Sequence, residues 1–123
     1  MTMLLKDLIS KLELNVFCSK GELDRPVSGG YCGDLLSDVM ANASAGFIWI
    51  TVQMHPNIAA VASLKELSGI VLVNDRQPQP ETIEKAESEK IPILGSKLSS
   101  YELAVQLHKL LSAGESHAEA SPS

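Results

Sequence analysis

Apolar residues follow two spacings along this chain, one typical of buried strands and one typical of helices. Residues 47–52 and 70–73 form almost unbroken apolar runs rich in β-branched residues, as in strands covered on both faces. Residues 14–18 and 91–94 give two shorter runs of the same kind. Apolar stripes at helical spacing lie beside these runs. They predict helices over approximately residues 2–12, 34–45, 56–67, 80–89 and 99–111.

This order of elements predicts a single α/β domain over residues 1–112 and a disordered, polar tail over residues 113–123. Strands that alternate with helices are joined by crossovers that set the strands side by side and in parallel. We therefore expect a three-layer α/β/α fold with a mainly parallel sheet of at least four strands. The strand exits expected at one edge of this sheet follow Cys18, Val52, Val73 and Leu94.

The clearest sign of a functional site is the turn after the 47–52 strand. Gln53, Met54 and His55 interrupt the apolar run, and Pro56 suits the first turn of a helix. In open α/β sheets, ligands bind where strands end in such turns. His55 is then a ligand contact, a structural hydrogen-bonding group or a general base.

A second candidate is the glycine-rich segment over residues 29–33, which precedes a helix opened by Asp34. Its glycines either cradle an anion or supply turn conformations, and the segment matches neither nucleotide-binding fingerprint. Together with the turn at residues 53–57, it gives our set of predicted ligand-binding residues. These are Gly29, Gly30, Gly33, Asp34, Gln53, His55, Asn57 and Asn74.

The sequence contains no recognisable spacing of catalytic or metal-binding residues. Cys18 precedes Arg25 by one residue more than in the thiolate loops of cysteine phosphatases, and Glu22 and Asp24 between them would repel phosphate. A small buried hydrophobe is the favoured interpretation of Cys18. The spacing of Cys18, Cys32 and His55 matches no zinc or iron–sulfur pattern. We expect a protein that is not an enzyme and has no metal or cofactor.

The charge and composition of the chain argue against some classes of binding partner. The net charge is −5 and the basic residues do not cluster, which argues against binding to nucleic acid. No apolar run approaches the length of a membrane span, so we expect no membrane association. The N-terminus lacks the features of a secretory signal, and two cysteines are too few for a disulfide framework. The expected location is the cytoplasm.

The helix predicted over residues 56–67 is apolar on almost every side and rich in small residues. Such a helix is buried twice, against its own sheet and against a second surface. Because symmetric pairing is the commonest oligomer geometry, a homodimer is the expected assembly. Trp49, the only tryptophan, is expected in the core or at a subunit contact.

Two segments carry a family resemblance. Residues 30–43, with Gly-Asp-Leu-Leu-Ser-Asp-Val, and residues 48–62, with Thr-Val-Gln-Met-His-Pro-Asn, resemble the DRTGG domain, above all its short single-domain members. The resemblance continues over roughly residues 3–112. It implies an α/β/α fold similar to the N-terminal domain of HPr kinase, and a dimerising or regulatory module of bacterial proteins. It brings no established catalytic residues.

The resemblance and the residues together indicate a non-enzymatic regulatory or ligand-sensing homodimer. Its ligand would be a nucleotide or a small anion at the edge where the strands end. Stand-alone members of the family often accompany redox or hydrogenase genes, which gives an alternative: an accessory protein with a redox-complex partner and no ligand. A small enzyme that uses Cys18 or His55 is the remaining alternative.

Overall fold

The computed structural model describes residues 2–119, with side chains through residue 113. Its elements follow the alternation that the apolar pattern predicts. They are β1 (Met3–Leu4), α1 (Leu5–Leu12), β2 (Asn15–Cys18), the 3₁₀ turn η1 (Lys20–Glu22), β3 (Pro26–Val27), β4 (Gly29–Cys32), α2 (Leu36–Asn42), β5 (Phe47–Thr51), α3 (Asn57–Leu64), β6 (Gly69–Leu72), α4 (Pro80–Glu89), β7 (Ile93–Gly95) and α5 (Ser100–Glu119).

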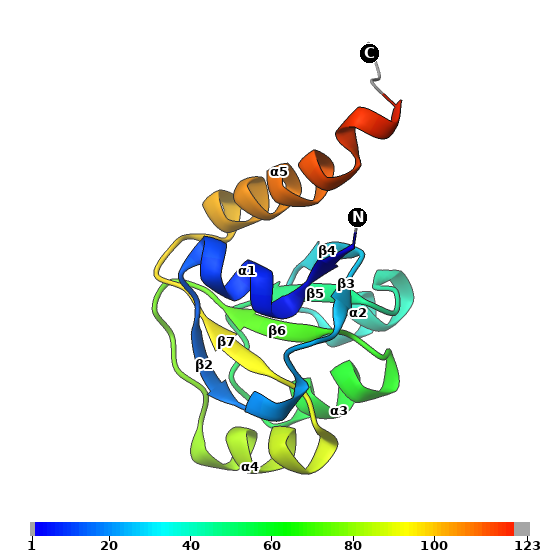
Figure 1. The fold of residues 1–123 in the computed structure, drawn as a ribbon. Coiled ribbons are helices and arrows are strands. Elements are labelled where there is room, and N and C mark those ends of the chain that lie inside the picture. The colour runs from blue at the N-terminus through cyan, green and yellow to red at the C-terminus, as the bar shows by residue number, and fades with distance from the viewer. Residues whose placement is uncertain (1, 120–123) are drawn as a thin grey trace.

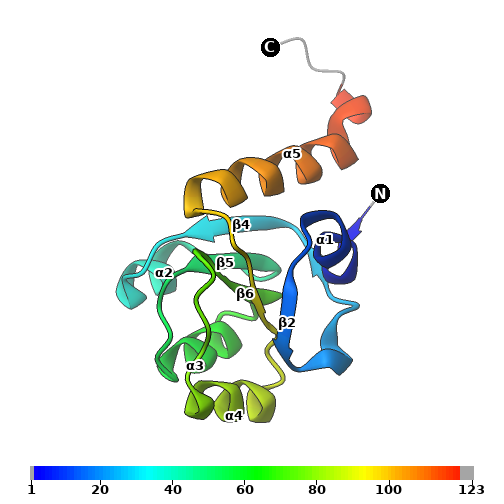
Figure 2. The same ribbon diagram turned by 90° about the vertical axis from the view of Figure 1, so that its left-hand side faces the viewer.

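A five-stranded sheet in the order β2-β7-β6-β5-β4 forms the middle layer (Figure 1). Strands β4 to β7 are parallel, and β2 pairs antiparallel with β7 at one border of the sheet. Helices α2, α3 and α4 cover one face, while α1 and α5 cover the other (Figures 1 and 2). The three-layer α/β/α fold with a mainly parallel sheet is therefore confirmed.

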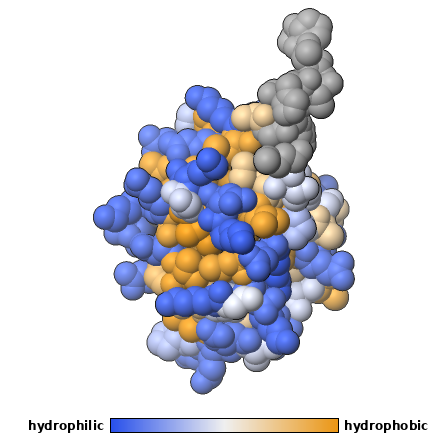
Figure 3. All heavy atoms as spheres, viewed as in Figure 1, coloured by the Kyte–Doolittle hydropathy of each residue, from blue (hydrophilic) through white to orange (hydrophobic). Residues whose placement is uncertain are grey.

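The two faces of the sheet build two cores, because successive side chains of a strand point to opposite sides. In β5, Ile48 and Ile50 join the core beneath α1 and α5, whereas Trp49 joins the core beneath α2, α3 and α4. Trp49 is fully buried. Figure 3 shows hydrophobic residues gathered in the middle of one face of the molecule, with hydrophilic residues around them.

The predicted position of the strand exit after Cys18 is wrong. Cys18 pairs with Ile93, the first residue of β7, so β2 ends at the edge where the parallel strands begin. A parallel arrangement needs a long crossover, usually a helix. The chain after Cys18 offers only the three-residue turn η1 before β3. The exits after β5, β6 and β7 do share an edge, since these strands are parallel.

The segment over residues 19–33, for which the apolar pattern predicts neither a strand nor a helix, contains strands β3 and β4. Glycine is rare in strands, but here two side chains pack close against the strand backbone. A Cβ atom at Gly29 would lie 2.7 Å from Cε1 of Phe47, and one at Gly30 would lie 2.9 Å from Cδ2 of Leu107. The absence of these side chains leaves room for Phe47 and Leu107 to pack against the backbone of β4.

The last helix extends further than the sequence pattern predicts. Helix α5 continues through Gly114 to Glu119, within the segment that we expect to be a disordered tail. Residues 120–123 of that segment lie outside the described residues. Disorder of the tail stays a prediction. None of the described helices is both long and apolar enough to cross a membrane.

Candidate functional site

Strands β4, β5 and β6 end at one edge of the sheet, where polar residues of their connections meet. Asp34, after β4, accepts hydrogen bonds through Oδ1 from Thr51 Oγ1 at 2.6 Å and from the backbone N–H of Val52 at 3.0 Å. Gln53 Nε2 donates to the backbone oxygen of Asp34 at 2.8 Å. These three hydrogen bonds tie the β4–α2 connection to the β5–α3 connection.

His55 and Asn57 sit at the start of α3 and are exposed. The backbone N–H of Asn57 donates to His55 Nδ1 at 3.1 Å, so the imidazole satisfies a first-turn N–H that the helix itself leaves free. The expectation that Pro56 opens this helix fits, because Pro56 occupies its N-cap. His55 therefore has a structural contact on one nitrogen and solvent around the ring.

Asn74 follows β6 in a left-handed conformation with φ of 59°. Its backbone N–H donates to the oxygen of Leu98 at 2.9 Å, and that of Asp75 donates to the oxygen of Ser96 at 2.8 Å. The exit of β6 is thus joined to the exit of β7.

The structure brings six of the eight predicted ligand residues to this edge. We call them the carboxyl edge: Gly33, Asp34, Gln53, His55, Asn57 and Asn74. Gly29 and Gly30 are separate from them, because they pair with Phe47 and Ile48 at the start of β5. The Asp34 carboxylate already accepts from an N–H group that an anion would need, and it adds negative charge. The part of the edge beside Asp34 therefore suits an uncharged group better than a phosphate.

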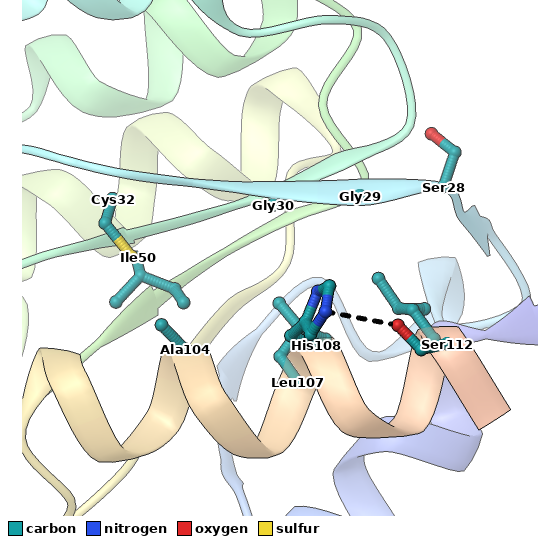
Figure 4. Close-up of a pocket in the computed structure, with 10 residues that line it drawn as sticks. Ser28, Gly29, Gly30, Cys32, Ile50, Ala104, Leu107, His108 and Ser112 are labelled. Atoms are coloured by element: carbon teal, nitrogen blue, oxygen red, sulfur yellow. Dashed lines mark hydrogen bonds between the residues drawn. The ribbon is translucent and has the colours of Figure 1, made fainter. Parts of the chain in front are cut away.

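Gly29 and Gly30 line a second feature, a cleft between β4 and α5 with a volume of about 270 Å³ (Figure 4). One wall is β4, the floor includes Ile50, and the other wall is α5 with Leu107 and His108. Figure 4 shows the Cys32 side chain pointing from β4 toward Ile50, and His108 rising from α5. We call this feature the β4–α5 cleft.

Polar groups of the β4–α5 cleft come from both walls. His108 Nε2 and Ser112 Oγ lie 3.3 Å apart on α5. Burial raises the pKa of the Cys32 thiol, and the charge of nearby Asp34 raises it further. Cys32 ends β4 and is followed directly by Gly33 and Asp34, so the cleft adjoins the carboxyl edge. Sequence reasoning missed this cleft, because it forms only when α5 packs on a strand about 75 residues earlier, and no local pattern reports such a contact.

The residues that the sequence offered for catalysis do not converge. Cys18 is buried, and its thiol contacts the backbone oxygen of Ile91 at 3.7 Å, at the edge opposite His55. Burial is also the main cause of the raised pKa of Cys18. Cys32 lies at the far border of the sheet from β2. Across the described residues, no three His, Cys, Asp or Glu side chains are grouped as a metal site would require.

Comparisons with known proteins give one informative result. No family model matches this chain, and no curated protein matches it at a significant level. Among solved structures, it is similar to the crystal structure of the CBS and DRTGG domains of the regulatory region of Clostridium perfringens pyrophosphatase, complexed with the activator diadenosine tetraphosphate. The TM-score is 0.67, the sequence identity is 16%, and the match covers 82% of this chain.

The match covers 44% of that pyrophosphatase region, so this chain spans less than half of its neighbour's length. At this level of identity the similarity concerns the fold alone. It agrees with the DRTGG-like α/β/α fold that the sequence resemblance implies.

Proposed function

We propose that this chain is a non-enzymatic regulatory module that binds a nucleotide and acts as a homodimer. The proposal rests on the fold of this chain, which is similar to that of a regulatory region crystallised with a nucleotide activator. The carboxyl edge and the β4–α5 cleft adjoin each other and supply exposed polar groups for such a ligand. A ligand regulates only if it binds two states of the protein with different affinity. The monomer and the proposed dimer are two such states.

The chemistry of the candidate nucleophiles supports a role other than catalysis. A thiol attacks as its thiolate, and burial raises the pKa of Cys18, while partial burial and the charge of Asp34 raise the pKa of Cys32. The Nδ1 atom of His55 is engaged by the backbone of Asn57. A small enzyme would need a base hydrogen-bonded to one of these thiols. His55 lies at the edge opposite Cys18, and among the described residues His108 of the cleft is hydrogen-bonded to Ser112 and not to Cys32.

The proposed subunit contact is the outer face of α3. Ile58, Ala59 and Ala62 are buried against the sheet, as the sequence pattern predicts for one side of this helix. On the other side Ala60 is exposed, and Leu64 exposes 69% of its surface. These two residues are one helical turn apart, so they form an apolar stripe that a second copy would cover.

Calorimetric titration with AMP, ATP and diadenosine tetraphosphate tests the ligand part of the proposal. We expect at least one of these nucleotides to bind and to raise the melting temperature. A ligand at 100 times its Kd stabilises the folded state by about 2.7 kcal/mol, which is several degrees for a chain of this size. If none of them binds, the ligand-sensing role is wrong. An accessory protein with a redox-complex partner would then be the better description.

Light scattering on Ala60→Glu tests the dimer. A carboxylate placed in an apolar contact loses its hydration without gaining a partner, so we expect the wild type to be a dimer and this variant a monomer. The matched control is Tyr101→Glu on α5, at a side chain that is 79% exposed on the other face of the sheet. A wild-type monomer, or a dimer lost only in the Tyr101 variant, would contradict the α3 contact.

A further inference from the structure

We propose that the β4–α5 cleft binds the base of the nucleotide, with the phosphates outside the cleft. This inference rests on the proposed function and adds the part of the ligand and the place where it binds. Three observations on the described residues carry it: the charge of the cleft, its shape and its polar groups.

The lining of the cleft favours an uncharged group. Among the described residues that line it, none is Lys, Arg, Asp or Glu. A phosphate inside it would lose water without gaining a cation, whereas a base carries no net charge at neutral pH. Asp34, which follows Cys32, keeps negative charge at the adjoining carboxyl edge and so favours phosphates that point to solvent.

The shape of the cleft suits a flat ring. Leu107 of α5 already packs against the backbone at Gly30, where a Cβ atom would lie 2.9 Å from its Cδ2, so a ring has room only beside this contact, between the backbone of β4 and α5. Ala104 and Leu111, which are both partly exposed, provide apolar surface for the ring. Ligand pockets commonly measure roughly 300–1,000 Å³. The cleft, at about 270 Å³, lies just below this range, so its size suits one part of a nucleotide, such as the base, and not a whole dinucleotide.

Hydrogen-bonding groups stand at the rim, where the edge of a base needs them. His108 and Ser112 present a nitrogen and a hydroxyl within one turn of α5. In the described part of the chain β4 pairs only with β5, which leaves the outer peptide groups of β4 without a neighbouring strand. Backbone groups of this kind read donors and acceptors on a base edge. A lipid chain would leave the outer peptide groups of β4 unpaired.

The reactivity of Cys32 tests whether a nucleoside occupies the cleft, because this residue lines the cleft and is exposed. Cys18, the other cysteine, is only 1% exposed. Native-state alkylation with N-ethylmaleimide should therefore modify Cys32 first. The probes are adenosine, guanosine, cytidine, uridine and inorganic triphosphate. At ten times its Kd, a nucleoside that occupies the cleft should slow the alkylation of Cys32 roughly tenfold, and triphosphate should not change it.

The reverse experiment uses the same thiol. Protein alkylated at Cys32 should lose at least tenfold in affinity for the nucleoside or nucleotide that binds the unmodified protein. Ala104→Leu, which fills the helix wall of the cleft, should do the same, with Gln106→Leu on the exposed side of α5 as the control. Fluorescence of Trp49 checks that each variant is folded. If the Ala104 variant does not fold, the affinity of the alkylated wild type still shows whether the nucleotide needs the cleft.

The outcomes separate this inference from the proposed function. A nucleotide that binds with unchanged alkylation of Cys32 and unchanged affinity after alkylation shows a site elsewhere, and only the cleft is then wrong. Protection by triphosphate alone would reverse the orientation and also overturn the inference. If no nucleoside and no nucleotide binds, the inference and the ligand-sensing function fail together.

Discussion

Replacement of Asp34 tests the arrangement of the carboxyl edge. In Asp34→Ala, Thr51 Oγ1 and the N–H of Val52 both lose their acceptor. A hydrogen bond to a charged group contributes about 1.5–3 kcal/mol, and less where water replaces the lost partner. Thr51 is 1% exposed, so its hydroxyl bears most of the cost, while water can reach the Val52 N–H. We expect the free energy of unfolding to fall by about 2 kcal/mol.

Asp34→Asn is the matched control, because an amide oxygen can accept the same two hydrogen bonds without the charge. We expect it to cost less than about 1 kcal/mol. The hydrogen bond from Gln53 survives in both variants, since it goes to the backbone oxygen of residue 34.

Urea unfolding followed by tryptophan fluorescence measures both variants. Trp49 is the only tryptophan, it is fully buried, and its Nε1–H donates to the oxygen of Gly33 at 2.8 Å. Its fluorescence therefore reports on the connection that Asp34 holds. Equal stability of wild type and Asp34→Ala would refute the reasoning. So would a loss as large in the asparagine variant as in the alanine variant, because the charge and not the hydrogen bonds would then matter.

Two further predictions concern pH and the C-terminus. The pKa of Cys18 is raised above its ordinary value of 9.0, mainly by burial, so the unfolded chain releases this proton at lower pH than the folded chain. The free energy of unfolding should therefore fall as the pH rises beyond about 9, and Cys18→Ala should reduce that slope in urea unfolding measured between pH 8 and 10. Deletion of residues 114–123 should leave the melting temperature unchanged, and a clear drop in calorimetry would show that this segment is docked.

The strands that the sequence predicts well are those whose pattern depends on burial alone. β5 and β6 lie in the middle of the sheet, are covered on both faces, and appear as almost unbroken apolar runs. The strands at the borders behave differently. β4 consists of Gly-Gly-Tyr-Cys, which has the composition of a turn, and only its contacts with Phe47 and Leu107 explain its glycines. Local propensity cannot show such contacts, because the partners lie far away in the sequence.

The sequence likewise predicts one part of the candidate site and not the other. The carboxyl edge follows in part from the order of the elements, since parallel strands bring their ends together, and the sequence places Gln53 and His55 there. The partners of Asp34 do not follow from the sequence: the prediction that this residue opens a helix is wrong, because its carboxylate accepts hydrogen bonds from Thr51 and Val52 and α2 begins at Leu36. The β4–α5 cleft depends on a long-range helix contact, so the sequence gives its residues without their arrangement.

The position of Asp34 suggests how a ligand in the cleft reaches the proposed dimer contact. Cys32, in the cleft wall, is two residues from Asp34, whose carboxylate holds the connection that leads into α3. A base that shifts the end of β4 would act on this connection, and α3 carries Ala60 of the proposed dimer contact. Coupling of this kind is reciprocal: a nucleotide that tightens the dimer must bind the dimer more tightly by the same factor. In Asp34→Ala the nucleotide should still bind, but the dimer dissociation constant should no longer depend on it. Equal dependence in both proteins, measured by analytical ultracentrifugation, would show that the coupling runs elsewhere.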